Sequence, residues 1–370
     1  MPQGGQRKQR SNISRAATST IKGVDLFCGA GGLTKGLEAA GIDIVFGVDV
    51  DPDCEYPYEA NNNARFVLKP VEALTVSDFS KAFKGRDVTL LAGCAPCQPF
   101  STYSQGNTGP SDERWHLLQH FGRLVQEAEP DLVTMENVPR LAKQRVFSDF
   151  VALLEDEGFH VSYSVVNWMG YGVPQLRQRL VLLASRLGPI NMIERSTEEV
   201  DYLTVREAIE NLPPLKAGEV CSTDPLHQAC ELSPLNLKRI RASKPGGSWR
   251  DWDKRLVADC HKKPSGKTYP SVCGRMSWDE PAPTMTTQFY GFGNGRFGHP
   301  EQDRAISLRE GAIIQGFPRS YKFVPIGAPI YRKPIGRLIG NAMPVNLAKA
   351  IGKTIVRHVR ECEQAKKRAA

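Results

Sequence analysis

The stretch "IKGVDLFCGAGGLTKGLEAAG" (residues 21–41) decides the fold class. An apolar run typical of a strand leads into a glycine-rich turn, and the turn opens a helix in which Leu33, Leu37 and Ala40 form an apolar stripe. A second strand-like run, "IDIVFGVDVD" (residues 42–51), follows at once. A strand, a helix and another strand in this order indicate a β/α unit with parallel strands.

Further strand-like runs continue this alternation, with helical stretches such as "HLLQHFGRLVQEA" between them. The expected strands are "DVTLLAGCAP" (87–96), "PDLVTMENVP" (130–139), "FHVSYSVVNW" (159–168) and "RQRLVLLAS" (177–185). Because strands alternate with helices, we predict an α/β fold with a doubly wound, mostly parallel sheet.

The composition divides the chain into four kinds of segment. Residues 1–20 are polar and basic, and we expect a disordered arm there. We expect one catalytic, cofactor-binding domain from residues 21–186 together with 301–358. Residues 187–300 are rich in Pro, Gly, Lys, Arg and Trp, with few periodic runs, so we expect a second, smaller and irregular lobe. Residues 359–370 are expected to form a frayed tail.

Charge and hydropathy narrow the class of protein. With 370 residues, 41% hydrophobic and 24% charged, a mostly disordered chain is excluded. No apolar run approaches the roughly 20 residues of a membrane helix, and the N-terminus has no apolar signal core, so we expect a cytoplasmic protein without a membrane partner. The net charge of +8 favours polyanionic partners, nucleic acid first.

The glycine-rich turn predicts a nucleoside ligand. Gly29, Gly31 and Gly32 would let the backbone approach a ligand closely, and the N-terminus of the next helix attracts negative groups. The full G-x-G-x-x-G spacing of dinucleotide sites is absent, because Thr34 stands where the last glycine would be. A shorter turn suits S-adenosylmethionine, which has no pyrophosphate.

An acid after the second strand supports a nucleoside. The run "VDVD" (residues 48–51) lies about 20 residues after the turn, where an acid usually accepts hydrogen bonds from ribose hydroxyls. We predict this role for Asp49, with Asp51 as the competitor. The alternative is that Asp49 only caps the next turn.

The two cysteines of "AGCAPCQPFS" (residues 92–101) allow three interpretations. A zinc site needs four ligands, but no second C-x-x-C pair exists, so we predict no metal. A redox pair normally opens a helix, whereas Pro96 and Pro99 surround Cys97. We favour the third interpretation, a nucleophilic thiolate at Cys97 beyond the carboxyl end of a buried strand, with Cys94 inert.

Six motifs, in order, resemble those of the DNA (cytosine-5) methyltransferase family of bacterial or phage type. They are "DLFCGAGG" (25–32), Pro96-Cys97-Gln98, Glu136-Asn137-Val138, Gln175, Arg177 and Arg179 of "YGVPQLRQRLVLLAS", "ISLREGAIIQGFP" (306–318) and "IGNAMPV" (339–345). The resemblance covers most of the chain and implies a Rossmann-like methyltransferase fold. It departs from the family where an aspartate often bonds the adenine amino group, because only Glu72 is present there.

The resemblance implies a covalent mechanism. Cys97 would add to C6 of a cytosine, so that C5 can attack the methyl group of S-adenosyl-L-methionine. Glu136 would protonate or hydrogen-bond N3, and Arg179 would donate to O2. Arg177 would brace the site or pair with Glu136, and Asn137 would shape the loop. If the resemblance is set aside, each residue has an ordinary alternative role: a carboxylate at a strand end can simply cap a helix, and two arginines two residues apart often form surface ion pairs.

The resemblance also implies the cofactor contacts, with S-adenosyl-L-homocysteine as product. Phe27 would pack on the adenine face, with core packing as its alternative, and Val50 would lie against the adenine. Asn341 and Ala342 would close over the methionine end, which brings the last helix back to the first strand. The remaining expected contacts are Asp25, Gly29, Gly31, Gly32, Asp49 and Pro96.

Double-stranded DNA is the expected partner, as in restriction-modification. A cytosine inside a duplex cannot meet Cys97, so the base would be flipped out, and the loop "STYSQGNTGPSDERWHLL" (101–118) would close on it. Residues 187–300, with the basic run "LKRIRASKPGGSWRDWDKRL" (237–256), would be the target-recognition domain. The alternatives are the same methylation on tRNA, a non-catalytic binder of this fold and a small-molecule methyltransferase. We expect a monomer.

Overall fold

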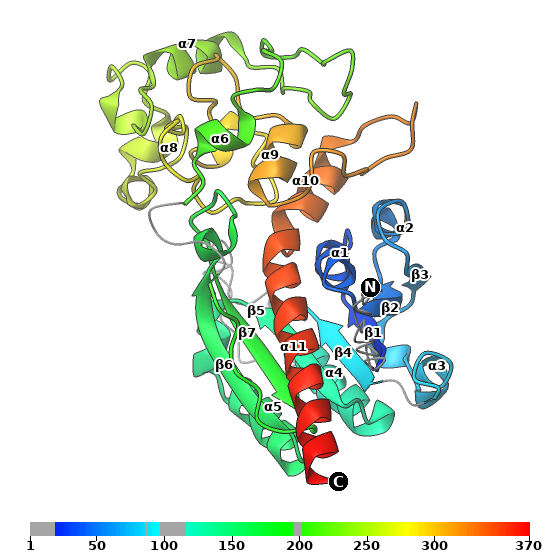
Figure 1. The fold of residues 1–370 in the computed structure, drawn as a ribbon. Coiled ribbons are helices and arrows are strands. Elements are labelled where there is room, and N and C mark those ends of the chain that lie inside the picture. Colours follow the sequence, from blue (N-terminus) through cyan, green and yellow to red (C-terminus); the bar gives the residue numbers. More distant parts are fainter. Residues whose placement is uncertain (1–18, 86–87, 97–115, 196–201) are drawn as a thin grey trace, which may run out of the picture.

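The structure is a computed structural model and describes residues 19–85, 88–96, 116–195 and 202–370. The chain forms two lobes (Figure 1). The larger lobe is built on a β-sheet, and the smaller lobe consists of short helices joined by long loops. Within the described residues, no helix is both long and apolar enough to cross a membrane.

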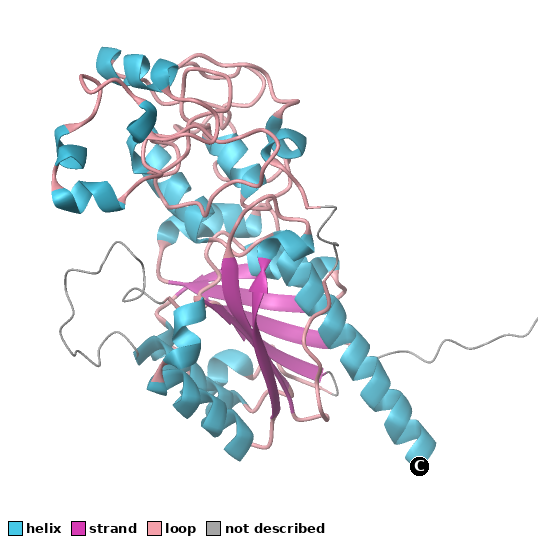
Figure 2. Ribbon diagram, turned by 90° about the vertical axis from the view of Figure 1, so that its left-hand side faces the viewer, coloured by secondary structure: helices cyan, strands magenta, loops and turns pink. Residues whose placement is uncertain are grey.

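One seven-stranded sheet, in the order β3-β2-β1-β4-β5-β7-β6, forms the centre of the larger lobe (Figure 2). Strands β1 to β5 are parallel, whereas β7 is antiparallel to both of its neighbours, β5 and β6. This confirms the predicted doubly wound, mostly parallel sheet. The strands are β1 (Ile21–Leu26), β2 (Asp43–Asp49), β3 (Arg65–Leu68), β4 (Val88–Gly93), β5 (Leu132–Asn137), β6 (His160–Asn167) and β7 (Gln178–Ser185).

The strand order fixes where a ligand can bind. β1 has β2 on one side and β4 on the other, so the direction of chain progression reverses between β1 and β4. Open α/β sheets bind their ligands outside the carboxyl ends of the strands at such a switch point. The glycine-rich turn directly follows β1, and Cys94 directly follows β4.

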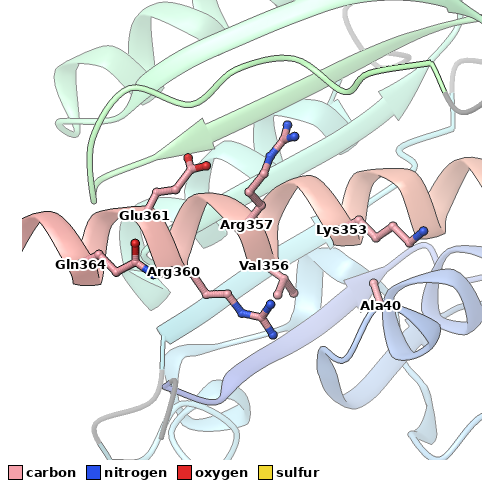
Figure 3. A pocket seen from close by; sticks show the side chains of 7 residues that line it. All are labelled: Ala40, Lys353, Val356, Arg357, Arg360, Glu361 and Gln364. Atoms are coloured by element: carbon pink, nitrogen blue, oxygen red, sulfur yellow. The ribbon is translucent and has the colours of Figure 1, made fainter. Parts of the chain in front are cut away.

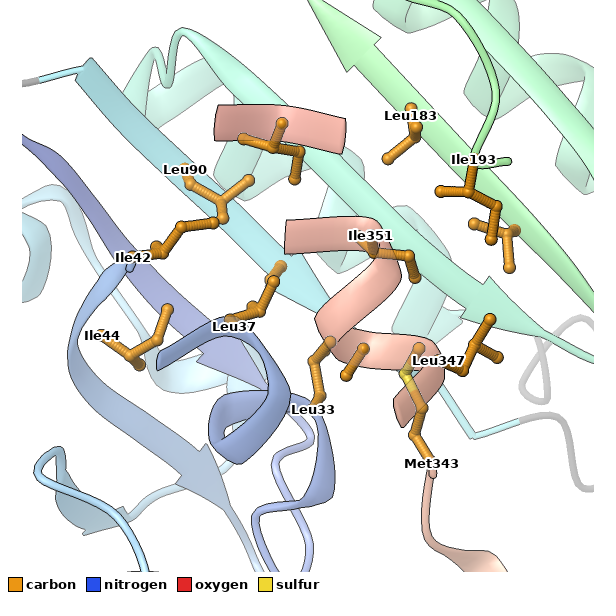
Figure 4. Close-up of a cluster of buried hydrophobic side chains, with 14 of the residues drawn as sticks. Leu33, Leu37, Ile42, Ile44, Leu90, Leu183, Ile193, Met343, Leu347 and Ile351 are labelled. Atoms are coloured by element: carbon orange, nitrogen blue, oxygen red, sulfur yellow. The ribbon is translucent and has the colours of Figure 1, made fainter. Parts of the chain in front are cut away.

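Helices cover both faces of the sheet. On one face, α1 (Gly32–Ala39) and α11 (Val345–Ala369) bury Leu33, Leu37, Leu347 and Ile351 in one cluster with residues of the sheet (Figure 4). A second cluster covers the other face and contains apolar residues of α3, α4 and α5. These helices are α3 (Val76–Phe79), α4 (His116–Ala128) and α5 (Arg145–Asp156), and α2 (Glu55–Glu59) lies between β2 and β3.

The resemblance implied that the last helix returns to the first strand, and in the structure α11 packs against the helix that follows this strand. A Cβ atom on Gly36 would lie 2.3 Å from the Cβ atom of Ala348, and one on Gly32 would lie 2.2 Å from the carbonyl oxygen of Met343. Both distances are far below ordinary van der Waals contact. Glycine at these positions therefore allows residues 343–348 to touch the helix that follows β1.

The smaller lobe contains the helices α6 (Val205–Ile209), α7 (Pro234–Ala242), α8 (Asp259–Lys262), α9 (Leu308–Ile314) and α10 (Arg332–Asn341). Short 3-10 segments are η1 (Pro52–Cys54), η2 (Val71–Ala73), η6 (Pro139–Lys143), η7 (Trp168–Tyr171), η9 (Trp249–Asp251), η10 (Pro264–Thr268) and η11 (Phe292–Asn294).

The boundary expected at residue 300 does not follow the packing. Apolar residues of α9 and α10 share one cluster with Val205 of α6, Met276 and Phe289. Beside this cluster, Arg304 and Glu310 form a fully buried ion pair with a 2.7 Å contact. The apolar faces of α9 and α10 thus pack against residues of the smaller lobe, although the same cluster also contains Ala30, Cys54 and Val345 of the larger lobe.

Two tryptophans of the basic run are core residues. Trp249 and Trp252 are only 8% and 6% exposed, and they share a cluster with Ile240 and Phe292. Their ring N–H groups donate to the carbonyl of Tyr269 and to the hydroxyl of Ser243. They therefore stabilise the smaller lobe from inside.

The tail predicted to fray beyond residue 358 is helical instead, since α11 continues to Ala369. Residues 359–369 contain neither glycine nor proline and are rich in good helix formers. Lys366, Lys367 and Arg368 also complement the negative end of the helix dipole. Of the predicted basic arm, residues 1–18 lie outside the described residues, and the backbone N–H of Ser19 donates to Glu363 at 3.1 Å.

Candidate active site

The strand pairing brings distant motifs together at one edge of the sheet. Leu26 of β1 pairs with Gly93 of β4, and Gly93 pairs with Met135 of β5. Because β7 runs antiparallel to β5, its first residues meet the last residues of β5, and Val181 pairs with Glu136. The glycine-rich turn, the end of β4, Glu136 and the arginines that begin β7 therefore share this edge.

Glu136 and Arg179 form an ion pair there. The Nε atom of Arg179 lies 3.0 Å from Oε1 of Glu136, and the side chains are only 15% and 11% exposed. Burial raises the pKa of Glu136 above its usual value, although the charges of Arg179 and Arg177 act to lower it. A carboxyl with a raised pKa, beside a fixed cation, is suited to donate a proton or to share one.

Trp168 forms a platform beneath both arginines, which the sequence analysis missed. The guanidinium carbons of Arg177 and Arg179 lie 4.6 Å and 5.6 Å from the centre of its ring. Cations over an indole face are attracted by the ring quadrupole. Trp168 is completely buried at the end of β6, and a tryptophan directly after a strand beside the arginine strand was the available hint.

Arg177 braces the site from within. Its side chain is 7% exposed, and Nη1 donates to the carbonyls of Met285 and Gly340 at 3.2 Å and 3.0 Å. Met285 belongs to the cluster shared by the smaller lobe, and Gly340 lies near the end of α10. Of the two roles predicted for Arg177, bracing fits these contacts, because the described salt bridge of Glu136 is to Arg179.

The segment after β4 is fixed to β5. Nδ2 of the buried Asn137 donates to the carbonyl of Ala95 at 3.0 Å, so Asn137 holds the chain that leads to Pro96, which is exposed. The Cys94 thiol lies 3.8 Å from the sulfur of Met343, and burial together with the charge of Glu136 raises its pKa far above the usual value. Cys94 therefore stays a protonated, poorly nucleophilic thiol.

Cys97 lies outside the described residues, as does most of the loop expected to close on the base, residues 101–115. Its nucleophilic role remains a prediction from the sequence. Within the described residues, no group of three or more potential metal ligands is present.

The turn after β1 is held open by backbone geometry. Phe27, Gly29 and Gly31 have positive φ angles of 58°, 52° and 87°. At Gly29 no atom lies within 4 Å of the position that a Cβ would occupy, so the backbone faces open space. Such a concave backbone, free of side chains, lets a ligand approach closely.

Asp49 joins this turn to the end of β2. One carboxylate oxygen accepts from the backbone N–H of Gly29 and the other from that of Asp51, both at 3.0 Å. Each oxygen retains acceptor capacity, so the capping contact does not exclude a ribose partner. Burial raises the pKa of Asp49, and the competing acid, Asp51, instead contacts Arg337 at 2.7 Å.

Asp25 lies deeper than a direct ligand contact would need. It is fully buried, one oxygen accepts from the hydroxyl of Thr34 at 2.7 Å, and the other has no hydrogen-bond partner among the described residues. The hydroxyl of Thr34 also lies 2.9 Å from that of Tyr58. Thr34, which interrupts the dinucleotide spacing, thus supports the aspartate beneath the turn.

The remaining predicted cofactor residues surround this turn. Val50 is 64% exposed although it is apolar, and Phe27 is half-buried and packs against the core. Asn341 is exposed and Ala342 half-buried, next to Met343, whose carbonyl touches Gly32. The Glu72 carboxylate lies 3.0 Å from Nε2 of His116, so it already has a partner. No residue is therefore assigned to the adenine amino group.

Known proteins share this arrangement in sequence and in structure. Residues 21–357 match the family model described as C-5 cytosine-specific DNA methylase. The chain is 48% identical over 338 residues to the Type II methylase M.HgiDII of Herpetosiphon aurantiacus, covering 90% of this chain and 94% of that protein. It is 35% identical over 346 residues to the Type II methyltransferase M.PspPI of Psychrobacter sp. (strain TA137), with 90% and 78% covered.

A solved structure extends the likeness to the fold. A protein encoded within a prophage and assigned as a DNA modification methyltransferase (E. coli) superposes with a TM-score of 0.70 at 21% identity, covering 92% of this chain and 99% of that one. From the family match and the identity to bacterial relatives, we conclude that the chain belongs to the C-5 cytosine-specific DNA methylases, and that it is a DNA cytosine-5 methyltransferase of bacterial type.

Proposed function

We propose that the protein transfers a methyl group from S-adenosyl-L-methionine to C5 of a cytosine flipped out of duplex DNA, through a covalent bond between Cys97 and C6. The observation that carries this proposal is the Glu136–Arg179 pair at the edge of the sheet. Asn137, next to Glu136, donates to the carbonyl of Ala95 and so fixes the described end of the segment after β4 beside the acid and the cation, which supports the proposal.

The residues around the turn fit S-adenosyl-L-methionine. Open space at Gly29, the carboxylate of Asp49 and the exposed apolar side chain of Val50 suit a nucleoside. Asn341 and Ala342 would hold the methionine end, and the close contact between Gly32 and Met343, the residue after Ala342, supports this assignment. When bound, this cofactor supplies an electrophilic methyl group on a sulfonium.

The side chains activate the cytosine. The Cys97 thiolate forms a bond to C6, and the electron pair displaced from the ring moves towards N3, where Glu136 donates a proton or a hydrogen bond. Arg179 donates to O2, where negative charge develops. C5 then carries the electron density needed to accept a methyl group. Loss of the C5 proton to a base and expulsion of Cys97 restore the aromatic ring.

The target base has to leave the duplex before it can meet these groups. We propose that the smaller lobe, with its basic run at residues 237–256, contacts the duplex and selects the sequence, and that the protein acts as a monomer in the bacterial cytoplasm. The names of the relatives, Type II methylases, favour DNA over the alternative substrate, tRNA.

A methyl-transfer assay tests the substrate. Purified protein and tritiated S-adenosyl-L-methionine are incubated with mixed-sequence duplex DNA and, separately, with tRNA. We expect label in DNA at C5 of cytosine, which bisulfite sequencing of the product would map to one sequence. Label in tRNA but not in DNA would replace this proposal with the alternative.

A further inference from the structure

A row of cations on α11 faces solvent far from the proposed active site. Lys353, Arg357 and Arg360 are exposed, and their spacing of four and three residues distributes them across the solvent-facing half of the helix. The opposite side, with Ile351, Ile355 and others, is buried against the sheet. We call Lys353, Arg357 and Arg360, with the half-buried Lys349 before them, the α11 cation row.

This row is not balanced by acids. From Val345 to Arg360 the helix contains no aspartate or glutamate. Among the described residues, the ion pair found for the row is the one between Arg357 and Glu194, at 2.9 Å, and Glu194 is itself 73% exposed. An ordinary solvated helix face mixes both signs of charge, because pairs of opposite sign stabilise it.

The spacing makes the charges repel each other. Lys349, Lys353 and Arg357 follow one another at four-residue intervals, and Arg360 follows three residues later. Like charges at these spacings each destabilise a helix by about 0.2–0.5 kcal/mol. A partner carrying negative charge removes this repulsion, so the row is suited to binding an anion.

The surface here is hollowed. A pocket of about 530 Å³ is lined by Ala40, Lys353, Val356, Arg357, Arg360, Glu361 and Gln364. Figure 3 shows Arg357 and Arg360 extending to opposite sides of α11, so the cations spread across the exposed width of the helix. Glu361 is the one acid of this lining and follows the row, which leaves the lining with a positive balance.

The described chain begins beside the row, and the sequence that precedes it is basic. Ser19 donates to Glu363 of α11, so the chain enters the described structure beside the row. Residues 1–18 contain four cations, Arg7, Lys8, Arg10 and Arg15, and no acid. The row itself, from Lys349 to Arg360, extends roughly 17 Å along the helix axis, which fits an extended polyanion better than a small ion.

The row cannot reach the base that reacts. α11 begins at the cofactor edge and runs along the sheet to the opposite end (Figure 1), which puts Arg360 roughly 22 Å along the helix axis from Val345. We propose that the α11 cation row is a second, sequence-independent contact for duplex DNA, which binds the phosphate backbone outside the cleft. This rests on the proposed function only in taking duplex DNA as the polyanion that the enzyme meets.

Salt dependence of binding tests the proposal. Wild type is compared with Lys353→Gln/Arg360→Gln and with the charge reversal Lys353→Glu/Arg360→Glu, sparing Arg357 because of its ion pair. The probe is a long duplex of A·T pairs alone, which holds no cytosine. We expect the negative slope of log K against log salt to become less steep by about 2 for the first variant. Binding at physiological salt should weaken on the order of ten-fold.

A matched variant distinguishes an effect of the α11 cation row from an effect of the protein's net charge. Lys81→Gln/Lys84→Gln removes two exposed cations elsewhere on the larger lobe and should leave the slope unchanged apart from a small shared effect. An equal change in both variants would overturn the proposal. Unchanged DNA binding with lost binding to anionic phospholipid vesicles would overturn it in favour of a membrane surface.

The methylation readout keeps the two proposals apart. Single-turnover methylation of a short duplex that holds the target should be the same in wild type and the row variants, because the row lies outside the cleft. If wild type methylates no duplex, the proposed function fails while the salt slope still reports on the row.

Discussion

Arg179 and Glu136 sit on adjacent antiparallel strands, and their side chains meet at 3.0 Å across the end of the sheet. This contact depends on the antiparallel pairing of β7 with β5, because it places the first residues of β7, including Arg179, beside the last residues of β5, including Glu136. Trp168 lies beneath the arginine, so the cation is held in place on two sides.

Replacing Arg179 by lysine should reduce kcat by about 10² or more, with less effect on the KM for DNA. Lysine keeps the charge but loses the planar donor group that rests on Trp168 and reaches Glu136. Steady-state methylation assays measure both constants. Arg186→Lys is the control, since Arg186 pairs with Glu157 at 3.1 Å at the opposite end of β7. Equal losses in both variants would contradict a role for Arg179 at the reacting base.

Asp25 should make the stability of the protein depend on pH. Burial raises its pKa from 3.8 to about 7, so between these values the folded state binds a proton that the unfolded state has lost. Stability due to this group is therefore present below about pH 4 and is lost as the pH rises towards 7, by up to about 4 kcal/mol.

Asp25→Asn should flatten this part of the profile, as measured by urea unfolding without ligand at a series of pH values. Asp43→Asn, an exposed carboxylate in the same lobe, serves as the control. A profile for Asp25→Asn that still falls as steeply as wild type would show that other groups cause the dependence.

Arg337 should secure the cofactor site from outside. Its Nη2 atom lies 2.7 Å from a carboxylate oxygen of both Asp51 and Asp53, so α10 is tied to the chain that follows Asp49. Arg337→Gln should raise the Kd for S-adenosyl-L-methionine several-fold, while single-turnover methylation at saturating cofactor stays near that of wild type.

Lys333→Gln, on the same helix and also exposed, should leave the Kd unchanged. Isothermal titration calorimetry measures both variants. An unaltered Kd in Arg337→Gln would show that the bridge does not support the site.

Sequence patterns predicted what depends on local order along the chain. The alternation of strands and helices gave the sheet, and the spacing of motifs placed Glu136, Arg179 and the turn at strand ends. The packing of distant residues was not visible in the same way. Trp168 and Thr34 support predicted residues through contacts that only the folded chain creates.

The errors have physical causes as well. Residues 301–341 were expected in the sheet domain, but apolar residues of α9 and α10 share a cluster with residues of the smaller lobe as well. The tail beyond residue 358 was expected to fray, whereas its helix-forming residues extend α11.

The central claim is the bond between Cys97 and the cytosine ring. A duplex that carries 5-fluorocytosine at the target position cannot lose its C5 substituent as a proton, so the covalent complex should accumulate with S-adenosyl-L-methionine. Denaturing electrophoresis and mass spectrometry detect it.

Cys97→Ser and the neighbouring Cys94→Ser form the decisive pair in this trapping measurement. We predict a denaturant-stable adduct with wild type and with Cys94→Ser, and none with Cys97→Ser. An adduct that survives in Cys97→Ser, or no adduct with wild type that does methylate duplex DNA, would contradict the account.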